Sequence, residues 1–377
     1  MGTYPSFAFT PNDDAIIIWA AGKIWRVPLR VNSLGEKVGS GEPHIIPFKA
    51  HIEKRLAETR SSETDLIRLE AAQEQRLHAF IDLTVDDEGK MVAFQGAGVS
   101  YYLDFSPAHS KGLSTAKKVP VIKPDHAYSS PSFVPGNNNF IIHSRWSDKD
   151  LSTLELASLS QDKAYEFSGL PLGRYLHPTL CACKGNKRQI AFIKTGGDYL
   201  SGNIIATANP GLYLGDVVLP DSETAVETTI EINNLRFIPS QIYVGDVTTM
   251  KFLDGNKKLL VHQSSRAFVI DLSSGPDDLG DYVHTAIAEG LMSAELAVPT
   301  HQNYVAFVDF FNVFVVSAEN AKGKELWSKP GMSTEGIARV SLDGGHNVQW
   351  SGDSTRLFWL LGESTSQEVP IKSKLVK

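Results

Sequence analysis

A short phrase recurs seven times along this chain: an apolar run leads into a turn rich in Asp, Asn and Gly, and a second apolar run follows. The turns are centred on Asn12, Asp87, Gly136, Gly185, Gly255, His301 and Gly352. Four of the six spacings between them are 46 to 51 residues, and the other two are 75 and 70. A repeat of about 50 residues built from strands is typical of a β-propeller, because one small sheet cannot bury both faces alone.

The strand that follows each turn is apolar without a clean alternation of apolar and polar residues. Examples are the ranges 15–19, 91–94, 190–193, 304–308 and 357–361. Such runs are typical of strands that neighbouring sheets cover on both faces. We therefore predict an all-β fold, with residues 1–377 forming a single β-propeller domain of four-stranded antiparallel blades. Seven repeats favour seven blades, and the two long gaps leave six or eight as alternatives. The gaps also predict insertions at about 31–76 and 196–244.

Composition excludes several classes of partner. Of the 377 residues, 42% are hydrophobic and 21% are charged, and the formal net charge is −7. Nucleic-acid binding requires clustered Lys and Arg, so we predict no nucleic-acid partner. The first eleven residues lack the basic and apolar segments of a signal peptide, and no apolar run is long enough to span a membrane. We expect a cytoplasmic protein with no membrane partner.

The two cysteines, Cys181 and Cys183, are two residues apart. In a strand such residues point to the same side and have little room to bridge one another. The chain has no further cysteine to complete a thiolate zinc site. We therefore predict two free, buried thiols in an intracellular protein.

Two segments near the N-terminus carry a more specific pattern. One reads Tyr-Pro-Ser-Phe-Ala-Phe-Thr-Pro-Asn-Asp-Asp over 4–14 and continues with Gly-Lys-Ile-Trp-Arg-Val over 22–27; the other is Ile-Ile-Pro-Phe-Lys-Ala-His-Ile-Glu over 45–53. The ranges 131–135 and 348–353 fit the same turn signature. Together they resemble the TolB-like (WD40-like) propeller that precedes the catalytic domain in a family of amidohydrolases.

In that family, metal-dependent hydrolysis belongs to a following barrel domain with His-x-His ligands. This sequence contains no His-x-His and ends soon after 368–371. The resemblance therefore implies a TolB-like propeller without the amidohydrolase domain, and the family's metal site is not carried over. We also find no Gly-x-Ser-x-Gly, P-loop, Gly-x-Gly-x-x-Gly or His-Glu-x-x-His motif, and we expect neither a metal nor a cofactor.

Propeller topology narrows the candidate site. The residue that begins the first strand of each blade and the residue that ends the second emerge opposite the turns, at the mouth where propellers usually bind ligands. Those suited to acid/base catalysis are His78, His177, His346, Asp246, Glu295 and Asp309. Those suited to binding a substrate are Tyr4, Trp19, Gln95, Tyr128, Arg145, Trp146, Lys194, Gln263 and Phe310. Polar residues also gather at strand ends because loops are solvated, so each of these has a structural alternative.

Two functions fit this pattern. The first is a small-molecule enzyme without a metal, in which acid/base side chains at the channel mouth drive an isomerisation, cyclisation, elimination or hydrolysis. Such an enzyme would suit a tailoring step on a natural product. The alternative is a non-catalytic TolB-like scaffold that binds a protein or a ligand, with the rim and the segment 30–76 as its contact surface. The ring of titratable residues favours the enzyme.

Overall fold

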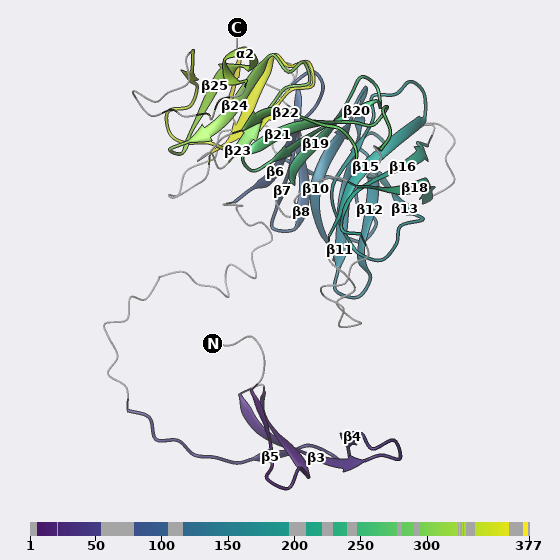
Figure 1. The fold of residues 1–377 in the computed structure, drawn as a ribbon, viewed down its shortest axis with the longest axis vertical. Coiled ribbons are helices and arrows are strands. Elements are labelled where there is room, and N and C mark those ends of the chain that lie inside the picture. Colours follow the sequence, from purple (N-terminus) through teal and green to yellow (C-terminus); the bar gives the residue numbers. More distant parts are fainter. Residues whose placement is uncertain are drawn as a thin grey trace. The chain divides into compact units, whose positions relative to one another are not determined.

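The computed structural model describes residues 6–20, 22–53, 79–104, 116–195, 209–220, 229–239, 247–276, 281–289, 295–322, 324, 326, 328, 336–361 and 372–375. The chain divides into two compact units, which we call the N-terminal unit (residues 1–73) and the ring unit (residues 74–377). Figure 1 shows their strands in sequence colours.

The N-terminal unit is one small antiparallel sheet. Its strands are β1 (Phe7–Phe9), β2 (Ala15–Ala20), β3 (Lys23–Val31), β4 (Lys37–Gly39) and β5 (His44–Ile46), in the order β1-β2-β3-β4, with β5 also paired to β3. The first predicted turn joins β1 to β2, where the Thr10 hydroxyl donates to the Asp14 carboxylate at 2.5 Å. Ala15 is buried, whereas the rings of Phe7 and Phe9 are more than half exposed.

In its described residues, the ring unit forms six sheets whose strands follow one another in sequence. The first two are β6 (Ile81–Val85), β7 (Met91–Gly96), β8 (Val99–Asp104) and β9 (Lys117–Lys118), then β10 (Ala127–Val134), β11 (Asn137–Ser147), β12 (Leu151–Ser158) and β13 (Lys163–Ser168). The third comprises β14 (Arg174–Leu180), β15 (Lys187–Thr195), β16 (Gly211–Val218) and β18 (Asn233–Ile238). The fourth comprises β19 (Val247–Leu253), β20 (Lys258–Gln263), β21 (Arg266–Asp271) and β22 (His284–Glu289).

The fifth sheet comprises β23 (Glu295–Ala297), β24 (Tyr304–Asp309), β25 (Asn312–Ser317) and β26 (Ala338–Arg339), and a one-turn helix α2 (Ala318–Ala321) follows β25. The sixth comprises β27 (His346–Trp350), β28 (Arg356–Leu360) and β29 (Lys372–Leu375). Strand β17 (Thr229–Glu231) crosses between sheets: it pairs in parallel with β13 before the chain returns as β18.

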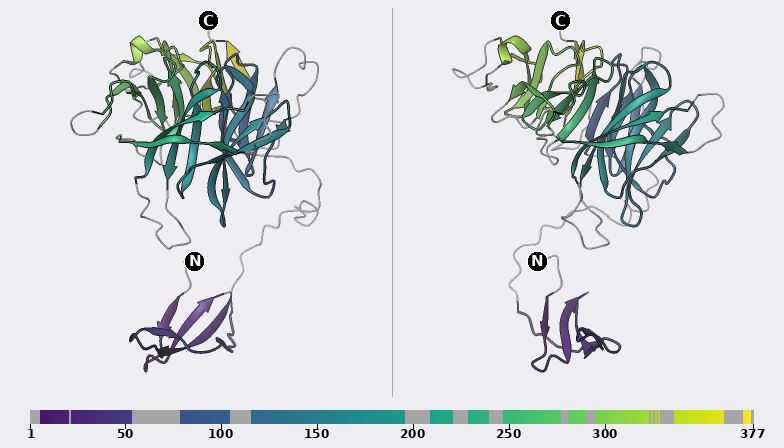
Figure 2. Two further views of the ribbon diagram at one scale, coloured as in Figure 1. Left: turned by 90° about the vertical axis from the view of Figure 1, so that its right-hand side faces the viewer. Right: turned by 45° about the vertical axis from the view of Figure 1, so that its right-hand side comes forward.

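The six sheets close into a ring. Their first strands contact one another in the order β6, β10, β14, β19, while β23 contacts β20 and β21 of the fourth sheet, and β27 contacts both β23 and β6. In both views of Figure 2 the yellow strands of the last sheet lie beside the blue strands of the first. The ring therefore closes between β27–β28 and β6–β7.

Apolar clusters fill the space between neighbouring sheets. One contains Ile142 and Leu154 from the second sheet together with Phe192 from the third. Another joins Phe94 of the first sheet to Phe358 of the last. Because both faces of these sheets are covered, their middle strands show the apolar runs without alternation seen in the sequence. The prediction of an all-β propeller with four-stranded antiparallel blades is confirmed.

The number of blades and the single-domain assignment stay predictions, since the first of the seven repeats, with its turn at Asn12, lies in the separate N-terminal unit. The two stretches predicted as insertions contain regular strands. Strands β4 and β5 lie within 31–76, and β16, β17 and β18 lie within 196–244. Strands β4, β5 and β17 are short and mostly exposed, so they carry little apolar signal. Strand β16 is instead a buried inner strand of its sheet, which the predicted insertion wrongly included.

The prediction of two free thiols is wrong. Cys181 and Cys183 form a disulfide, with their Cα atoms 5.3 Å apart. Strand β14 ends at Leu180, so the cysteines lie just past it, and the chain is free to turn the two sulfur atoms toward each other. Disulfides persist in oxidising compartments, so the predicted cytoplasmic location loses the support that free thiols gave it. Among the described residues, no helix is long and apolar enough to cross a membrane.

The closing contact gives a stability prediction. The turn of the last sheet lies against the turn of the first: the Gly352 amide donates to the Asp86 carbonyl, and the Asp353 amide donates to the Asp87 carbonyl at 2.8 Å. A Cβ on Gly352 would lie 2.8 Å from the Asp87 Cα atom, which is main chain and cannot rotate away. We expect Gly352→Ala to lower the free energy of unfolding by about 1–3 kcal/mol through overpacking.

Denaturant unfolding followed by circular dichroism measures this loss. The control is Gly39→Ala, where an added Cβ meets no atom within 4 Å. Equal stability of the two variants would contradict a tight closing contact at Gly352.

Candidate functional site

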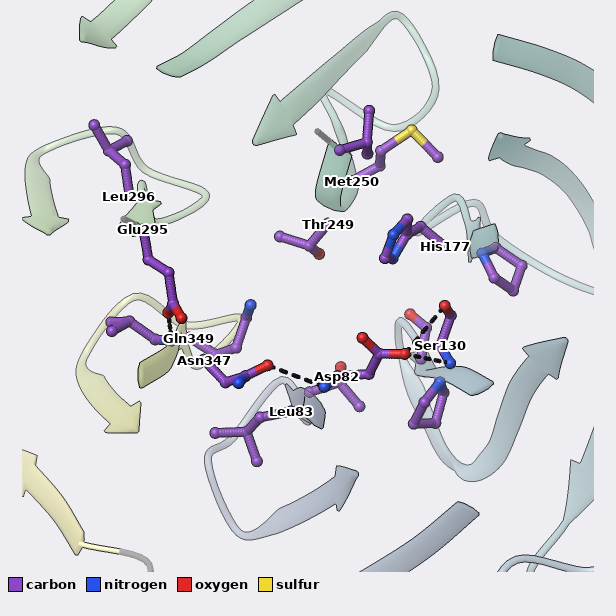
Figure 3. A pocket seen from close by; sticks show the side chains of 16 residues that line it. Asp82, Leu83, Ser130, His177, Thr249, Met250, Glu295, Leu296, Asn347 and Gln349 are labelled. Atoms are coloured by element: carbon purple, nitrogen blue, oxygen red, sulfur yellow. Dashed lines mark hydrogen bonds between the residues drawn. The ribbon is translucent and has the colours of Figure 1, made fainter. Parts of the chain in front are cut away.

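A central pocket opens where the first strands of the six sheets converge. It has a volume of about 330 Å³, and β6, β10, β14, β19, β23 and β27 all contribute to its wall. Figure 3 shows side chains from these strands pointing toward a common centre. The lining side chains that can transfer a proton or form a hydrogen bond are Asp82, Ser130, His177, Thr249, Glu295, Asn347 and Gln349. The six sheets thus build one polar pocket that no single sheet contains.

A repeated irregularity of the first strands delivers several of these side chains. The pairing register shifts at the same place in β6, β10, β14 and β27, each time against the second strand of the sheet. At each shift one residue adopts a left-handed backbone: Asp82 (φ 55°), Ser130 (φ 51°), His177 (φ 51°) and Asn347 (φ 51°). A β-bulge of this kind redirects a side chain that the regular alternation would place between the blades.

These left-handed residues carry strain. Placing a residue with a Cβ in this region costs roughly 1–2 kcal/mol, and Asp, Asn and His tolerate it better than Ser. Four such residues around one pocket form a concentration of strain of the kind that functional sites display. The repeated bulge therefore indicates that this pocket is a functional site and not a gap left by packing.

The carboxylate of Asp82 links two sheets across the pocket wall. It accepts hydrogen bonds from the Ser130 amide at 2.8 Å and from the Ser130 hydroxyl at 3.3 Å. The Asp82 amide in turn donates to the side-chain oxygen of Asn347 at 3.0 Å. The bulge residues of three sheets are thereby joined, which fixes the Asp82 carboxylate at the pocket (Figure 3).

His177 faces the same space from β14. Burial lowers the pKa of its imidazole below the usual 6.5, and the charge of Asp82 and a hydrogen bond to the Val247 main chain oppose this effect. The ring is therefore neutral near pH 7. A ring nitrogen that donates to a carbonyl leaves the other nitrogen as an acceptor, which is the form of a general base.

Glu295 lies across the pocket from His177 (Figure 3). Its carboxylate accepts a hydrogen bond from the Val348 amide at 3.0 Å. Burial raises the pKa of this carboxyl above 4.5, although hydrogen bonds from the main chain of Val348 and Asn347 work in the opposite direction. Glu295 thus holds β27 against β23 and also brings a carboxyl with a raised pKa to the pocket wall.

Two of the site residues predicted from sequence, His177 and Glu295, lie in this wall. Both belong to the first strand of a sheet: Glu295 begins β23, whereas His177 lies at the bulge in the middle of β14. His346 precedes the wall residue Asn347 and is itself part buried; burial lowers its pKa, and it hydrogen-bonds the main chain of Phe80. Tyr4, His78 and Asp246 lie outside the described residues.

Tyr128 and Arg145 belong to a different, buried network inside the second sheet. Glu155, fully buried, accepts hydrogen bonds from the Tyr128 hydroxyl at 3.2 Å and from the Arg145 guanidinium. The Ile122 amide donates to the same carboxylate at 3.1 Å. A second guanidinium nitrogen of Arg145 reaches Glu166 at 3.1 Å. These groups form hydrogen bonds and ion pairs with one another within the sheet, which gives Tyr128 and Arg145 a structural role there.

The other predicted catalytic and binding residues of the ring unit are not among the residues that line the central pocket. Asp309 accepts from the amide and hydroxyl of Ser328, Trp146 packs under Arg174, and Lys194 lies over the Tyr213 ring. Gln263 is buried at the end of β20 and Gln95 is half-buried in β7, whereas Phe310 is exposed. Trp19 lies in the N-terminal unit and is half exposed. Most of these residues end a second strand, which is one strand removed from the channel, and this explains their absence from the wall.

Sequence reasoning missed Asp82, Ser130 and Asn347. Each stands a few residues ahead of a predicted turn centre and next to an apolar or proline residue. A polar residue that tolerates the left-handed region, repeated at that distance, is the signal that predicts the bulge. Among the described residues, no group of three or more His, Cys, Asp or Glu side chains is arranged to hold a metal ion.

Comparison with solved structures shows weak similarity over most of the chain. The β-propeller domain of Cps50 (Swd1) from Myceliophteria thermophila is 11% identical with a TM-score of 0.41, covering 95% of this chain and 94% of that one. Hydrazine synthase from Kuenenia stuttgartiensis is 10% identical with a TM-score of 0.43, covering 85% and 99%. An oligogalacturonate lyase solved in complex with manganese is 10% identical with a TM-score of 0.44, covering 81% and 79%.

No protein-family model and no curated protein sequence matches this chain. At these identities the structural similarity concerns the fold and carries nothing about activity.

The buried network of the second sheet gives a second stability prediction. Arg145→Met leaves the Glu155 carboxylate buried without its cation, so we expect a loss of about 3–5 kcal/mol in the free energy of unfolding. The control, Arg266→Met, removes an exposed ion pair with Glu289 at 3.8 Å and is expected to cost about 0–1 kcal/mol. Urea denaturation measures both, and a cost for Arg145→Met as small as that of the control would return Arg145 to the list of binding candidates.

Proposed function

We propose that this protein is a small-molecule enzyme that works by acid/base catalysis in the central pocket. The observation that carries the proposal is the set of bulges that turn His177 and Asp82 out of their sheets and into one polar pocket. A structural role does not require a strained backbone at these positions in successive sheets. The pocket size suits a small ligand.

In the proposed reaction His177 is the general base. Its neutral imidazole accepts a proton from the substrate, and the nearby Asp82 carboxylate stabilises the imidazolium that results. The raised pKa of Glu295 suits it to return a proton as the general acid. Thr249, Asn347 and Gln349 supply hydrogen-bonding groups that orient a polar substrate. Removal and return of a proton at neighbouring atoms is the common element of isomerisation, cyclisation, elimination and hydrolysis.

We further propose that the propeller is of the TolB-like type. The turn sequences at 4–14 and 348–353 support this assignment. The second of them contains the turn whose hydrogen bonds close the ring.

The central test is substitution of the base. His177→Gln keeps a polar side chain and removes the proton acceptor, so we expect kcat to fall by about 10²–10⁴-fold while substrate binding remains. A thermal-shift screen of small polar metabolites identifies a ligand, and turnover is then followed by mass spectrometry. The control is His301→Gln, an exposed histidine outside the pocket. Full turnover by folded His177→Gln would refute the assignment.

The pKa directions predict the shape of the pH profile. The base requires neutral His177, so activity rises with pH through a value below 6.5. The acid requires protonated Glu295, so activity falls with pH through a value above 4.5. We expect a bell-shaped profile of kcat/KM on the acidic side of neutrality, with the falling limb lost in Glu295→Gln. A falling limb that survives this substitution would exclude Glu295 as the acid.

A binding scaffold is the alternative, and the N-terminal unit favours it. Phe7 is 66% exposed, Phe9 is 52% exposed and Trp19 is 48% exposed, so one small sheet presents three aromatic side chains. Aromatic residues are enriched in protein interfaces. The segment 30–76 is the remaining part of the proposed contact surface.

The triple variant Phe7→Ser, Phe9→Ser, Trp19→Ser tests this alternative. If the unit docks a protein, a partner captured by the wild type is lost from the variant while the ring unit keeps its melting temperature. An unchanged set of bound proteins would count against the scaffold.

A further inference from the structure

A second pocket lies at the turn end of the same first strands. Its volume is about 470 Å³, and it shares Thr84 and Ser132 with the central pocket. The two pockets therefore adjoin along the first strands, and their walls differ. This turn-end pocket is lined by apolar side chains, namely Val85, Phe133, Pro135, Ala182 and Phe252, together with a single lysine, Lys251.

The amine of Lys251 has an unusual setting. Its Nζ donates a hydrogen bond to the Trp350 carbonyl at 3.0 Å, which ties β19 to the last strand pair across the channel. Among the described residues, no carboxylate lies within ion-pairing distance of this nitrogen. Lys258 in the same sheet is the ordinary case, since its amine lies 3.2 Å from the Asp254 carboxylate and its side chain is 42% exposed.

The surroundings of Lys251 favour the neutral amine. Burial lowers the pKa of Lys251 from 10.5 to about 8, and the charge of Asp87 opposes this effect. Roughly a fifth of such an amine is unprotonated at pH 7.4, against less than about 0.1% of an ordinary lysine. The residue as a whole is half-buried, and its side chain forms part of the pocket wall.

The other titratable groups facing this nitrogen are three carboxylates and one imidazole. Asp87 and Glu88 come from the turn after β6, Asp353 comes from the turn after β27, and His262 comes from β20. The pKa of His262 is lowered to about 3 by burial, so this ring is neutral. Negative charge around the pocket disfavours an anionic ligand.

We propose that the turn-end pocket binds an aldehyde or ketone with an apolar body and that Lys251 forms an imine with its carbonyl carbon. The apolar wall accommodates the body of the ligand, and the amine stands where a carbonyl group of such a ligand would enter. This site uses none of the side chains assigned to acid/base catalysis, since Asp82, His177 and Glu295 do not line the turn-end pocket.

The step balances without an oxidant or a metal. The neutral amine adds to the carbonyl carbon, and the resulting carbinolamine loses its hydroxyl as water while the nitrogen gives up its protons. A carbon–nitrogen double bond replaces the carbon–oxygen double bond. Asp87, on the wall of the same pocket, is placed to exchange the protons that this dehydration needs.

The test uses the wild-type full chain and benzaldehyde as the probe. The protein is incubated with benzaldehyde and sodium cyanoborohydride at pH 7.4, which reduces an imine to a stable amine, and the modified lysines are quantified by peptide mass spectrometry. We expect Lys251 to be labelled at least about tenfold faster than Lys258, because far more of its amine is neutral. Labelling of Lys251 at or below the rate of Lys258 would overturn the proposal.

Two further measurements separate the alternatives. The labelling rate of Lys251 should rise through a midpoint near pH 8, and a midpoint near that of a free lysine would also overturn the proposal. Benzoate has the same ring with an anionic group and should not protect Lys251; protection by benzoate without labelling by benzaldehyde would identify an anion site instead.

The imine proposal and the acid/base proposal fail independently. His177→Gln should label at Lys251 as the wild type does, because its substitution lies in the central pocket. In Lys251→Met the label at this position disappears while labelling of Lys258 is unchanged. Since the labelling ratio is measured on wild-type protein, the test does not depend on whether this variant folds.

Discussion

Every sheet of the ring unit must be covered on both faces, and the remaining structure depends on this constraint. Phe192 and Phe307, in the middle strands of two sheets, are fully buried because a neighbouring sheet packs on each side. An open row of such sheets would leave one apolar face exposed at each end. Closure removes both, and it is achieved where Phe358 meets Phe94 and where the Arg356 guanidinium donates to the Gly89 carbonyl at 2.8 Å.

Closure also creates the channel and gives it two different ends. Once six first strands converge, the bulges at Asp82, Ser130, His177 and Asn347 all face one space. The tight turns gather carboxylates at the other end, around the buried amine of Lys251. A single scaffold thus places a polar, titratable pocket and an apolar pocket with a lysine along the same axis.

Buried polar groups in this protein serve two separate purposes. Glu155, Arg145 and Tyr128 satisfy one another within a sheet, and their charges are compensated where they stand. His177 and Lys251 instead have pKa values displaced by burial and a side that faces a cavity. The distinction between a structural and a chemical polar residue therefore depends on what lies on its open side and not on burial alone.

The sequence by itself determined the fold class, because the spacing of the turns and the apolar runs between them are local properties of the chain. It also pointed to His177 and Glu295, which lie in the wall of the central pocket, because both belong to a first strand and the first strands line this pocket. It did not find Asp82, Ser130 and Asn347, because a bulge shifts the side-chain alternation by one residue and leaves only a faint signal.

Only the tertiary structure decided that Arg145 and Tyr128 face Glu155, that the two cysteines join, and that Lys251 opens into a pocket. The first and the third depend on which residues meet across different strands, and the second depends on how the chain bends just past the end of β14. A repeat pattern fixes the positions of strands along the chain but does not fix the partners of their side chains.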